Sequence, residues 1–244
     1  MAESMPSYNR GVVKPVECLE AGWALVKDQY WLFVGMTAVG MLIGGLVPMG
    51  IVMGAMMCGI YLAFFERMRG RRSNFDLLFK GFDYFVDSLV ATLLQFMPIL
   101  AVLIPFYVLF FAGLFAYLPT RRGGTPPDAV TQAALMVGAG LLILVVVAIA
   151  IAVGVCFIFS YALIIDRKLS GIQAAKLSIK ASFANFWGLL GLLLLNGLLS
   201  LVGALCCYVG AFLVLPVTFA AVATAYRQVF GLSEDQPPSV LSSS

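Results

Sequence analysis

Between Gln29 and Phe65 the chain reads QYWLFVGMTAVGMLIGGLVPMGIVMGAMMCGIYLAFF, 37 residues without a single charged side chain. A membrane-spanning helix needs about 20 apolar residues, so this stretch is too long for one span. A segment rich in glycine and proline, GGLVPMG at residues 44–50, interrupts it, and such residues are typical of a tight turn. The stretch therefore predicts a hairpin of two short transmembrane helices, at residues 30–47 and 48–65.

Three further runs without charged residues follow, at residues 88–120, 129–165 and 181–226. Pro98 and Pro105 in the first of them are expected to kink one helix rather than divide it, because either half would be too short to span. The second run has no strong helix breaker after Gly140 and predicts one long helix. The third is long enough for two helices, and Gly203 is the expected turn residue between them. The six predicted spans are residues 30–47, 48–65, 88–117, 132–165, 183–202 and 205–228.

The composition indicates a membrane protein. Hydrophobic residues make up 62% of the 244 residues and charged residues 11%, against about 25% charged residues in an average soluble domain. A soluble protein of this length cannot bury that much apolar surface. The apolar runs are continuous and lack the alternating polarity of transmembrane β-strands. We therefore expect an all-α polytopic membrane helical bundle with six transmembrane helices.

Basic residues lie almost entirely on one side of the predicted spans. Thirteen of the fifteen Lys and Arg residues fall before the first span, between the second and third, between the fourth and fifth, or at the end of the sixth. Only Arg121 and Arg122 fall on the opposite side. Because cytoplasmic loops carry an excess of Lys and Arg, we expect both termini in the cytoplasm and the protein in the plasma (inner) membrane.

The two ends of the chain are expected to be disordered. Residues 1–14 precede the first apolar periodicity, and residues 232–244 contain a Pro-Pro pair and a final run of three serines. Polar, proline-containing ends of this kind rarely bury enough surface to fold. The transmembrane domain is then residues 15–231.

Each cytoplasmic segment that leads into an outgoing span carries apolar residues at helical spacing. The three stripes are Val16, Leu19, Trp23, Val26 and Tyr30; Phe75, Leu78, Phe79, Phe82 and Phe85; and Ile172, Ala175, Ile179, Phe183 and Phe186. Such amphipathic helices are typical of the membrane interface, with the apolar face toward lipid or toward the bundle. We therefore predict three cytoplasmic interfacial helices. Leu19–Trp31 and Ala175–Trp187 align without gaps, which indicates either a duplicated unit or the common recurrence of interfacial helices.

Several short motifs accompany these helices. Gly22-Trp23 precedes the first hairpin, FDLLFKGF lies at residues 75–82, YALIID closes the fourth span at residues 161–166, and an Ala- and Ser-rich stretch covers residues 174–185. With this layout the chain resembles uncharacterised bacterial six-span integral membrane proteins, similar in layout to the membrane domain fused to some glycerophosphodiester phosphodiesterases. The resemblance covers about residues 12–231 and implies the six-span fold. It implies no phosphodiesterase activity, because its motifs do not include that catalytic domain.

The sequence offers little catalytic or metal-binding chemistry. It contains no His, which excludes His-based zinc sites and Ser-His-Asp or Cys-His catalysis. Apart from Arg227, one residue from the end of the sixth predicted span, all charged residues lie outside the predicted spans, which argues against an ion-coupled transporter or pump. The cytoplasmic acids Glu66, Asp76, Asp83, Asp87 and Asp166 are expected to form solvated helix faces, although an enzyme acting on lipid head groups could use them. We predict that the protein is not an enzyme and binds no cofactor, metal or nucleic acid.

Three groups of residues are candidate contacts. The first comprises Arg67, Arg69, Arg71 and Arg72, which would face the anionic inner leaflet as lipid head-group contacts or serve as the topology signal alone. The second comprises Gln95 and Asn196, polar residues inside predicted spans that would bond between helices or contact a solute. The third comprises Met49, Met53 and Met57, which repeat on one helical face and would either fill gaps between helices or bind a soft metal such as Cu(I).

Spans without charged residues, a basic loop and interfacial helices together favour a non-enzymatic protein with a membrane-organising or lipid-interacting role. The alternative is an uncoupled transporter or channel-like carrier for a small neutral or apolar solute, which Gln95, Asn196 and the proline-containing third span would suit. The expected partner is the lipid bilayer, with anionic lipids at the arginine loop. The sequence does not indicate an oligomeric state.

Overall fold

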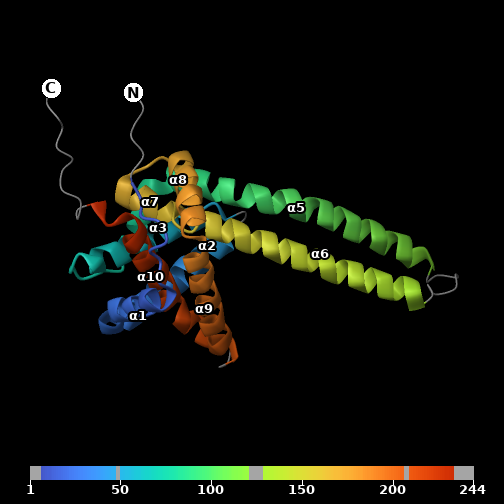
Figure 1. The fold of residues 1–244 in the computed structure, drawn as a ribbon, viewed down its shortest axis with the longest axis horizontal. Helices are drawn as coiled ribbons and strands as arrows, with labels where there is room; N and C mark the ends of the chain where they lie inside the picture. Colours follow the sequence, from blue (N-terminus) through green and yellow to red (C-terminus); the bar gives the residue numbers. More distant parts are fainter. Residues whose placement is uncertain (1–6, 48–49, 121–128, 206–208, 234–244) are drawn as a thin grey trace, which may run out of the picture. The chain divides into compact units, whose positions relative to one another are not determined.

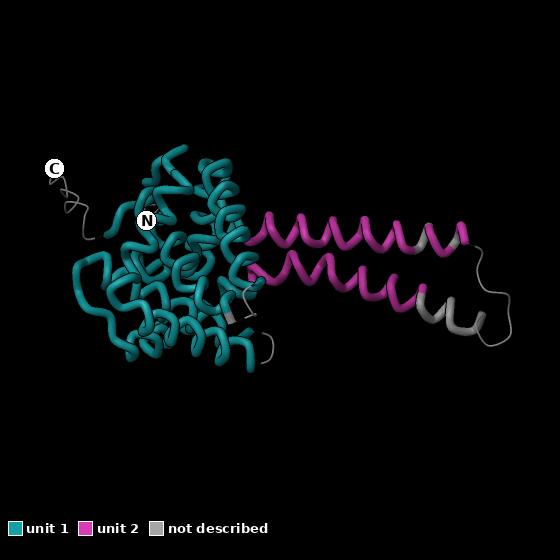
Figure 2. The backbone as a smooth tube through the Cα atoms, turned by 90° about the horizontal axis from the view of Figure 1, so that it is seen from below, with its two compact units in different colours: residues 1–93, 155–244 teal, residues 94–154 magenta. Residues whose placement is uncertain are grey.

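All regular secondary structure in the described residues is helical, and no strand is present among them. This computed structural model describes residues 7–47, 50–120, 129–205 and 209–233. The chain divides into two compact units, which Figure 2 distinguishes by colour. Unit 1 comprises residues 1–93 and 155–244, and unit 2 comprises residues 94–154.

Figure 1 shows the helices in chain order. They are α1 (Pro15–Val26), the 3-10 helix η1 (Lys27–Gln29), α2 (Tyr30–Leu46), α3 (Met53–Met68), α4 (Leu77–Lys80), the 3-10 helix η3 (Gly81–Tyr84), α5 (Phe85–Thr120), α6 (Ala129–Cys156), α7 (Ser160–Arg167), α8 (Gly171–Ala184), α9 (Phe186–Leu205) and α10 (Val209–Phe230). The boundaries between the units fall inside α5 and near the end of α6. Unit 2 therefore consists of most of α5 and most of α6, which run alongside each other in Figures 1 and 2.

Five helical stretches of the described residues are long and apolar enough to cross a membrane. They are Pro15–Leu46, Leu77–Gly113, Met136–Arg167, Phe186–Leu205 and Gly210–Phe230. The remaining predicted span, residues 48–65, corresponds to α3, which has 16 residues and is just shorter than the usual range of about 17 to 25. The structure thus confirms an all-α protein whose long apolar helices suit a membrane.

Helix α10 lies at the centre of unit 1, with α1, α2, α3 and α9 packed around it. Small side chains make this packing close. A Cβ atom on Gly22 of α1 would lie only 2.7 Å from the amide nitrogen of Ala221, which is buried on α10. Small residues allow helix backbones to approach in this way. Helix α1 is therefore packed directly onto the bundle.

Buried aromatic rings join several helices of unit 1. Phe33 of α2 stacks on Phe64 of α3 with ring centroids 4.9 Å apart. Phe65 of α3 contacts Tyr226 of α10 at 5.3 Å, and Tyr226 contacts Phe159, just before α7, at 6.1 Å. All five rings are buried. Because aromatic pairs add to the stabilisation from burial, this cluster fixes α2, α3, α7 and α10 in one core.

The turn between α2 and α3 lies slightly later than the sequence predicts. Gly44 and Gly45 are still helical, and α2 ends at Leu46. Gly50 has a φ of 65°, the left-handed conformation that favours glycine. A Cβ atom on Gly44 would lie 2.6 Å from the sulfur of Met53 on α3. Gly44 therefore serves the close contact between the two helices, and the turn itself uses Gly50.

The predicted fourth span, residues 132–165, is two helices in the structure, so the prediction of one continuous helix is wrong. A turn at residues 157–159 separates α6 from α7. The Ser178 hydroxyl of α8 accepts a hydrogen bond from the Phe159 amide at 3.2 Å and donates one to the Cys156 carbonyl at 2.8 Å. These bonds satisfy backbone groups that the interruption leaves free. Residues 155–160 contain neither Gly nor Pro, so the local sequence gives no sign of the break.

The prediction of Gly203 as a turn residue is also wrong. Helix α9 continues to Leu205, and a Cβ atom on Gly203 would lie 2.8 Å from the carbonyl oxygen of Gly210 on α10. This glycine therefore serves the contact between α9 and α10. The division between these two helices falls at residues 206–208, outside the described residues. In α5, by contrast, Pro98 and Pro105 lie within one helix, as predicted.

The chain is anchored beyond both ends of the predicted transmembrane domain. Val13 is buried, and the Lys14 amide donates a hydrogen bond to Gln228 Oε1 at 3.2 Å. At the other end Leu232 is buried. The predicted disorder of residues 1–14 and 232–244 is therefore wrong for this part of the chain, because the sequence pattern does not show that α10 supplies partners. Residues 1–6 and 234–244 lie outside the described residues.

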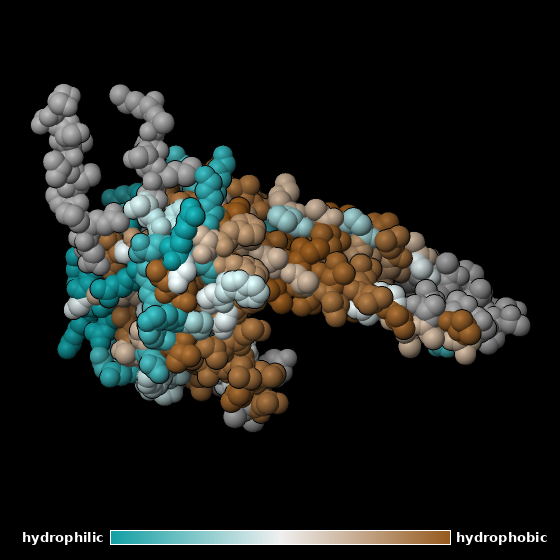
Figure 3. Space-filling view, viewed as in Figure 1, coloured by the Kyte–Doolittle hydropathy of each residue, from teal (hydrophilic) through white to brown (hydrophobic). Residues whose placement is uncertain are grey.

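Unit 2 exposes apolar side chains along its length. Val108, Leu109, Leu141 and Leu144 are each more than half exposed. On the face shown in Figure 3, hydrophobic residues cover the part of unit 2 that is described, whereas hydrophilic residues gather on unit 1. An exposed apolar surface of this extent marks a contact with lipid or with another protein.

Candidate functional site

Polar segments that are far apart in the sequence meet at one end of unit 1, which we call the polar end. The Asn9 amide donates a hydrogen bond to the Val229 carbonyl at 2.8 Å, and Asn185 Nδ2 donates one to the Asn9 carbonyl at 3.0 Å. Arg67, in the last turn of α3, forms an ion pair with Asp28 of η1. The N-terminal segment, η1 and the ends of α3, α8 and α10 therefore lie together. Arg121 and Arg122 lie outside the described residues.

Asp166, near the end of α7, carries a fully buried carboxylate at the polar end. Its Oδ2 atom accepts a hydrogen bond from the Tyr226 hydroxyl at 2.8 Å and lies 3.2 Å from Arg167 Nε. Its Oδ1 atom accepts hydrogen bonds from the Ser233 amide at 3.2 Å and hydroxyl at 2.9 Å, and lies 3.5 Å from Arg69 Nη2. A buried carboxylate requires such partners. We call these five residues the Asp166 network.

Two of the four predicted lipid-contact arginines share one acid. Arg69 bridges Asp166 and Glu66, with 3.3 Å between Arg69 Nη1 and Glu66 Oε1. Arg71 Nη1 lies 3.2 Å from Glu66 Oε2, and the Arg71 side chain is 59% exposed. Arg69 is therefore an internal link between α3 and α7, whereas Arg71 also faces the surroundings.

Arg67 and Arg72 likewise differ in whether they contact the protein or face the surroundings. Arg67 pairs with Asp28, and its Nε donates a hydrogen bond to the Leu25 carbonyl at 3.3 Å. This contact fixes the end of α1 against α3. Arg72 is exposed. Lipid contact by the four arginines stays a prediction, and the structure places Arg71 and Arg72 where such contact is open to them.

The five acids that the sequence predicts to be cytoplasmic do not form one exposed cluster. Asp76 and Asp83 are exposed, as expected for solvated helix faces. Asp87 Oδ1 accepts a hydrogen bond from the Gly171 amide at 3.2 Å, at the start of α8. Glu66 and Asp166 do meet, at Arg69, but the Asp166 carboxylate is buried. The expectation of a solvated Asp166 is therefore wrong, because partners from three other segments surround it.

Helices α1 and α8 bury small residues and expose large apolar ones. The buried positions are Cys18, Gly22 and Val26 in α1, and Gly171, Ala174, Ala175, Leu177, Ser178, Ala181 and Ser182 in α8. Val16 and Trp23 of the first predicted stripe are half exposed or more, as are Ile172 and Phe183 of the third. In these helices much of the apolar stripe thus faces away from the protein core, which is the arrangement that lipid contact requires.

The second predicted interfacial helix is not continuous. Helix α4 and the 3-10 helix η3 have four residues each, and α5 begins directly after them. Gly81 allows this compact arrangement, because a Cβ atom there would overlap the carbonyl oxygen of Ala55 on α3. Phe79 and Phe82 remain exposed, and Leu78 is buried. The segment keeps an exposed apolar side without forming one amphipathic helix.

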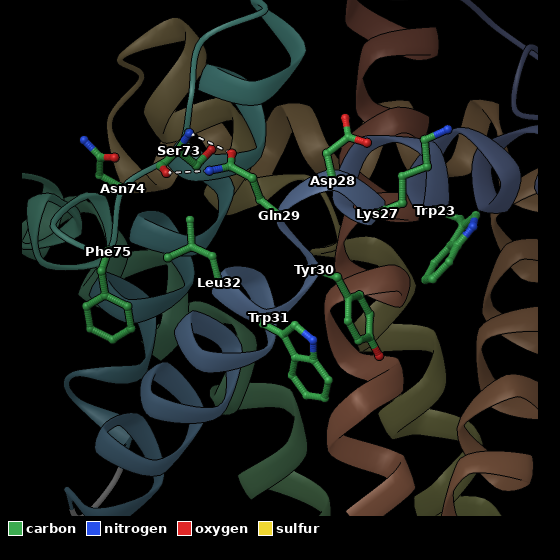
Figure 4. A pocket seen from close by; sticks show the side chains of 10 residues that line it. All are labelled: Trp23, Lys27, Asp28, Gln29, Tyr30, Trp31, Leu32, Ser73, Asn74 and Phe75. Atoms are coloured by element: carbon green, nitrogen blue, oxygen red, sulfur yellow. Dashed lines mark hydrogen bonds between the residues drawn. The ribbon is translucent and has the colours of Figure 1, made fainter.

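A groove of about 690 Å³ opens beside α1 at the polar end. It is lined by Trp23, Lys27, Asp28, Gln29, Tyr30, Trp31, Leu32, Ser73, Asn74 and Phe75. Gln29 joins its two sides, since Gln29 Nε2 donates to the Ser73 carbonyl and the Ser73 amide donates to Gln29 Oε1, both at 3.2 Å. Figure 4 shows this pair of hydrogen bonds between η1 and the segment before α4. The volume is within the usual range of about 300–1,000 Å³ for ligand sites.

The predicted intramembrane residues lie in different parts of the chain. Gln95 is partly buried in the part of α5 that belongs to unit 2, and Asn196 is partly buried in α9 of unit 1. Asn196 Oδ1 is buried and has no hydrogen-bond partner among the described residues. Met53 and Met57 are partly buried on α3, and Met49 lies outside the described residues. Solute and copper binding at these residues stay predictions.

Several residues of the polar end were not singled out in the sequence. Tyr226 lies at the end of an apolar run, and Ser233 lies in the tail that we expected to be disordered. Lys27 was counted only as a topology signal, although it lines the groove. No local motif marks Tyr226 or Ser233, because their partner Asp166 is 60 and 67 positions away in the sequence.

No family model, no curated protein and no solved structure matches the chain. The resemblance to uncharacterised six-span membrane proteins therefore stays a prediction, and the functional argument depends on the geometry described above.

Proposed function

We propose that the protein is an integral protein of the plasma (inner) membrane with six spans, three interfacial segments and both termini in the cytoplasm. Three sets of contacts support an even number of crossings. Arg67 at the end of α3 pairs with Asp28 before α2. The Gly171 amide after α7 bonds to Asp87 at the start of α5. Gln228 near the end of α10 accepts a hydrogen bond from Lys14, as Asn185 before α9 does from Val12.

Each pair of helices thus returns to the end of the bundle at which it began. In this arrangement α3 crosses the membrane although it has only 16 residues. The basic residues at the polar end favour the cytoplasmic side, as the distribution of Lys and Arg in the sequence predicts.

The proposed role is non-enzymatic and membrane-organising. The observation that carries it is the unequal length of the helices. Helices α2 and α3, with 17 and 16 residues, are about 25 Å long, whereas α6, with 28 residues, is about 42 Å long. A hydrocarbon core of about 30 Å is thicker than the length of α2 and α3 and thinner than the length of α6. Tilting the long helices and thinning the bilayer around the short ones would accommodate both, so the protein would impose a local difference in thickness.

Exposed aromatic side chains support placement of the polar end at the head-group level. Trp31 is 75% exposed and Trp187 is 82% exposed, each at the start of an outgoing apolar helix. Tryptophan is enriched at this depth because its ring is apolar and its N–H remains hydrated. These residues would hold the interfacial segments in place while the helices deform the surrounding lipid.

The test is the distribution of fluorescently labelled protein in giant vesicles that contain coexisting thick and thin lipid phases. We expect the protein to accumulate at the phase boundaries. A matched control deletes seven residues from each long helix, residues 101–107 and 143–149, which keeps the helical phase and removes about 10 Å from each. The shortened protein should leave the boundaries for the thin phase. A full-length protein distributed like the shortened one would contradict the proposed role.

The alternative, an uncoupled carrier for a small neutral solute, is favoured by one observation. Asn196 Oδ1 is buried in α9 without a hydrogen-bond partner among the described residues. A solute with a hydrogen-bond donor would satisfy it. Flux of neutral solutes into proteoliposomes, compared between the natural protein and Asn196→Leu, separates the two functions. A flux that the substitution abolishes would favour the carrier.

A further inference from the structure

The groove beside α1 has polar groups on one side and aromatic rings on the other. In Figure 4, Lys27 and Asp28 extend to one side of η1, whereas the rings of Tyr30 and Trp31 point away from them along α2. The ring of Trp23 approaches Tyr30 edge-on at 5.6 Å, and Trp31 approaches it edge-on at the same distance. Polar groups above a row of aromatic rings match the order of head group and acyl chain in a lipid.

The two charged residues that line the groove have capacity for a ligand. Lys27 is exposed, and its side chain forms no ion pair or hydrogen bond with the residues that the structure describes. Asp28 uses Oδ2 for Arg67, and within the described part of the chain no partner occupies Oδ1. The side chain of Asp28 is 58% exposed. A cation and an anion therefore stand next to each other at the head-group side, and one oxygen of the anion is open to a donor although Arg67 pairs with the other.

We propose that this groove binds one phospholipid with a zwitterionic head group that carries a primary ammonium, such as phosphatidylethanolamine. The lipid phosphate would lie against Lys27, and the ammonium would donate hydrogen bonds to Asp28 Oδ1. The first part of the acyl chains would pass over Tyr30 and Trp31. This inference rests on the proposed placement of the polar end at the cytoplasmic head-group level.

The two contacts together distinguish this lipid from other phospholipids. An anionic lipid would satisfy Lys27 but bring no ammonium to Asp28 Oδ1. Phosphatidylcholine has both charges, but its quaternary ammonium has no N–H to donate to a carboxylate. Phosphatidylethanolamine satisfies both side chains at once.

The three tryptophans of the chain provide a direct assay. Trp187→Phe leaves Trp23 and Trp31, both at the groove, as fluorescent reporters. Trp23→Phe with Trp31→Phe leaves Trp187, which lies at the start of α9 outside the groove lining. Each protein is reconstituted in phosphatidylcholine. Tryptophan quenching is then measured as acyl-brominated phosphatidylethanolamine, phosphatidylcholine or phosphatidylglycerol with the same acyl chains is added, which gives the relative binding constant of each lipid.

At the groove reporter we expect phosphatidylethanolamine to bind about fivefold more strongly than phosphatidylcholine, the effect of about 1 kcal/mol that one exposed charge contact can supply. The Trp187 reporter should show no preference. Asp28→Asn in the groove-reporter protein should abolish the preference, because the two lipids differ in the ammonium that contacts Asp28 Oδ1. Lys27→Gln should weaken both lipids alike, because both carry the phosphate. Asp83→Asn, at an exposed aspartate of η3 outside the groove lining, should leave the preference unchanged.

The outcomes separate the groove from the membrane placement. Equal quenching by all three lipids at both reporters would show ordinary surrounding lipid and overturn the groove proposal, while the proposed membrane placement would stand. Preference for phosphatidylglycerol at the groove would also overturn it, because the site would then select anionic lipid. If brominated lipid quenched neither reporter, the membrane placement itself would fail.

Discussion

Asp166 places a carboxylate inside unit 1, and its cost is offset by partners that come from four segments. The partners are the Tyr226 hydroxyl, Ser233 and two arginines, whose side chains are 17% exposed for Arg69 and 11% for Arg167. Removing one member of such a network leaves the others buried without compensation. The network therefore holds the end of α10 against α3 and α7.

Replacing Asp166 with Asn should lower the free energy of unfolding by about 3 kcal/mol, because two largely buried guanidinium groups lose the Asp166 charge, although Arg69 still pairs with Glu66. Unfolding in detergent measures this change. Asp76→Asn is the matched control, since Asp76 is exposed, and it should change stability by less than about 0.5 kcal/mol. Equal effects of the two substitutions would show that the Asp166 network contributes nothing.

Gly81→Ala should prevent α4 and η3 from packing on α3, because the added methyl group would overlap the Ala55 carbonyl oxygen. Backbone atoms cannot move aside as a flexible side chain can, so we expect a loss of about 3 kcal/mol or more. The yield of folded protein after purification and its thermal unfolding measure this loss.

Gly197→Ala is the control for Gly81→Ala, because no atom lies within 4 Å of a Cβ atom at Gly197. In the middle of α9 the change to alanine should be neutral or stabilising by up to about 1 kcal/mol. A Gly81→Ala protein as stable as Gly197→Ala would mean that α3 and α4 are farther apart than the structure places them.

At the scale of elements, the sequence predicts helices well and interruptions poorly. Helices α2, α5, α9 and α10 were predicted from apolar runs, which can be recognised in the sequence by their length alone. The break between α6 and α7 was missed because the Ser178 hydroxyl, which satisfies the backbone groups at the break, comes from a third helix. Gly44 and Gly203 were assigned to turns because glycine permits both turns and close packing, and only the neighbouring helix decides which applies.

The candidate site was predicted only in part, because the partners of its residues also come from distant segments. The arginines of the loop were recognised from their number, but not the acids that Arg67 and Arg69 bind, since Asp28 and Asp166 are 39 and 97 positions away. The groove was not predicted, because its two sides come from segments separated by 44 positions, as the Gln29–Ser73 pair shows.

Ser178→Ala should destabilise the junction of α6 and α7 by about 1–3 kcal/mol, because the Phe159 amide and the Cys156 carbonyl lose their partner. Ser182→Ala, one turn further on α8, is the matched control. Ser182 is also buried, but its hydroxyl has no hydrogen-bond partner among the described residues, so its loss should be neutral or stabilising. Thermal unfolding of both proteins measures the difference, and the opposite order would refute this account of the break.

For the whole molecule, the central question is how many helices cross the membrane. Five stretches are long enough by themselves, and α3 is the short exception. The contacts at the polar end nevertheless return α3 to the end at which α2 began, since Arg67 pairs with Asp28 and Gln29 bonds to Ser73. These contacts support the proposal of six crossings, which requires in addition that α2 and α3 both cross the bilayer. The sequence predicts the same number from the alternation of basic loops.

Labelling of single cysteines with a membrane-impermeant maleimide tests the crossing of α2 and α3 most directly. The five native cysteines are replaced by Ser, and Ile51→Cys or Asn74→Cys is introduced, one on each side of α3. The account predicts that Cys at position 51 is labelled in intact cells, whereas Cys at position 74 is labelled only after the membrane is permeabilised. Labelling of both positions from the same side would show that α3 does not cross and would contradict the six-span arrangement.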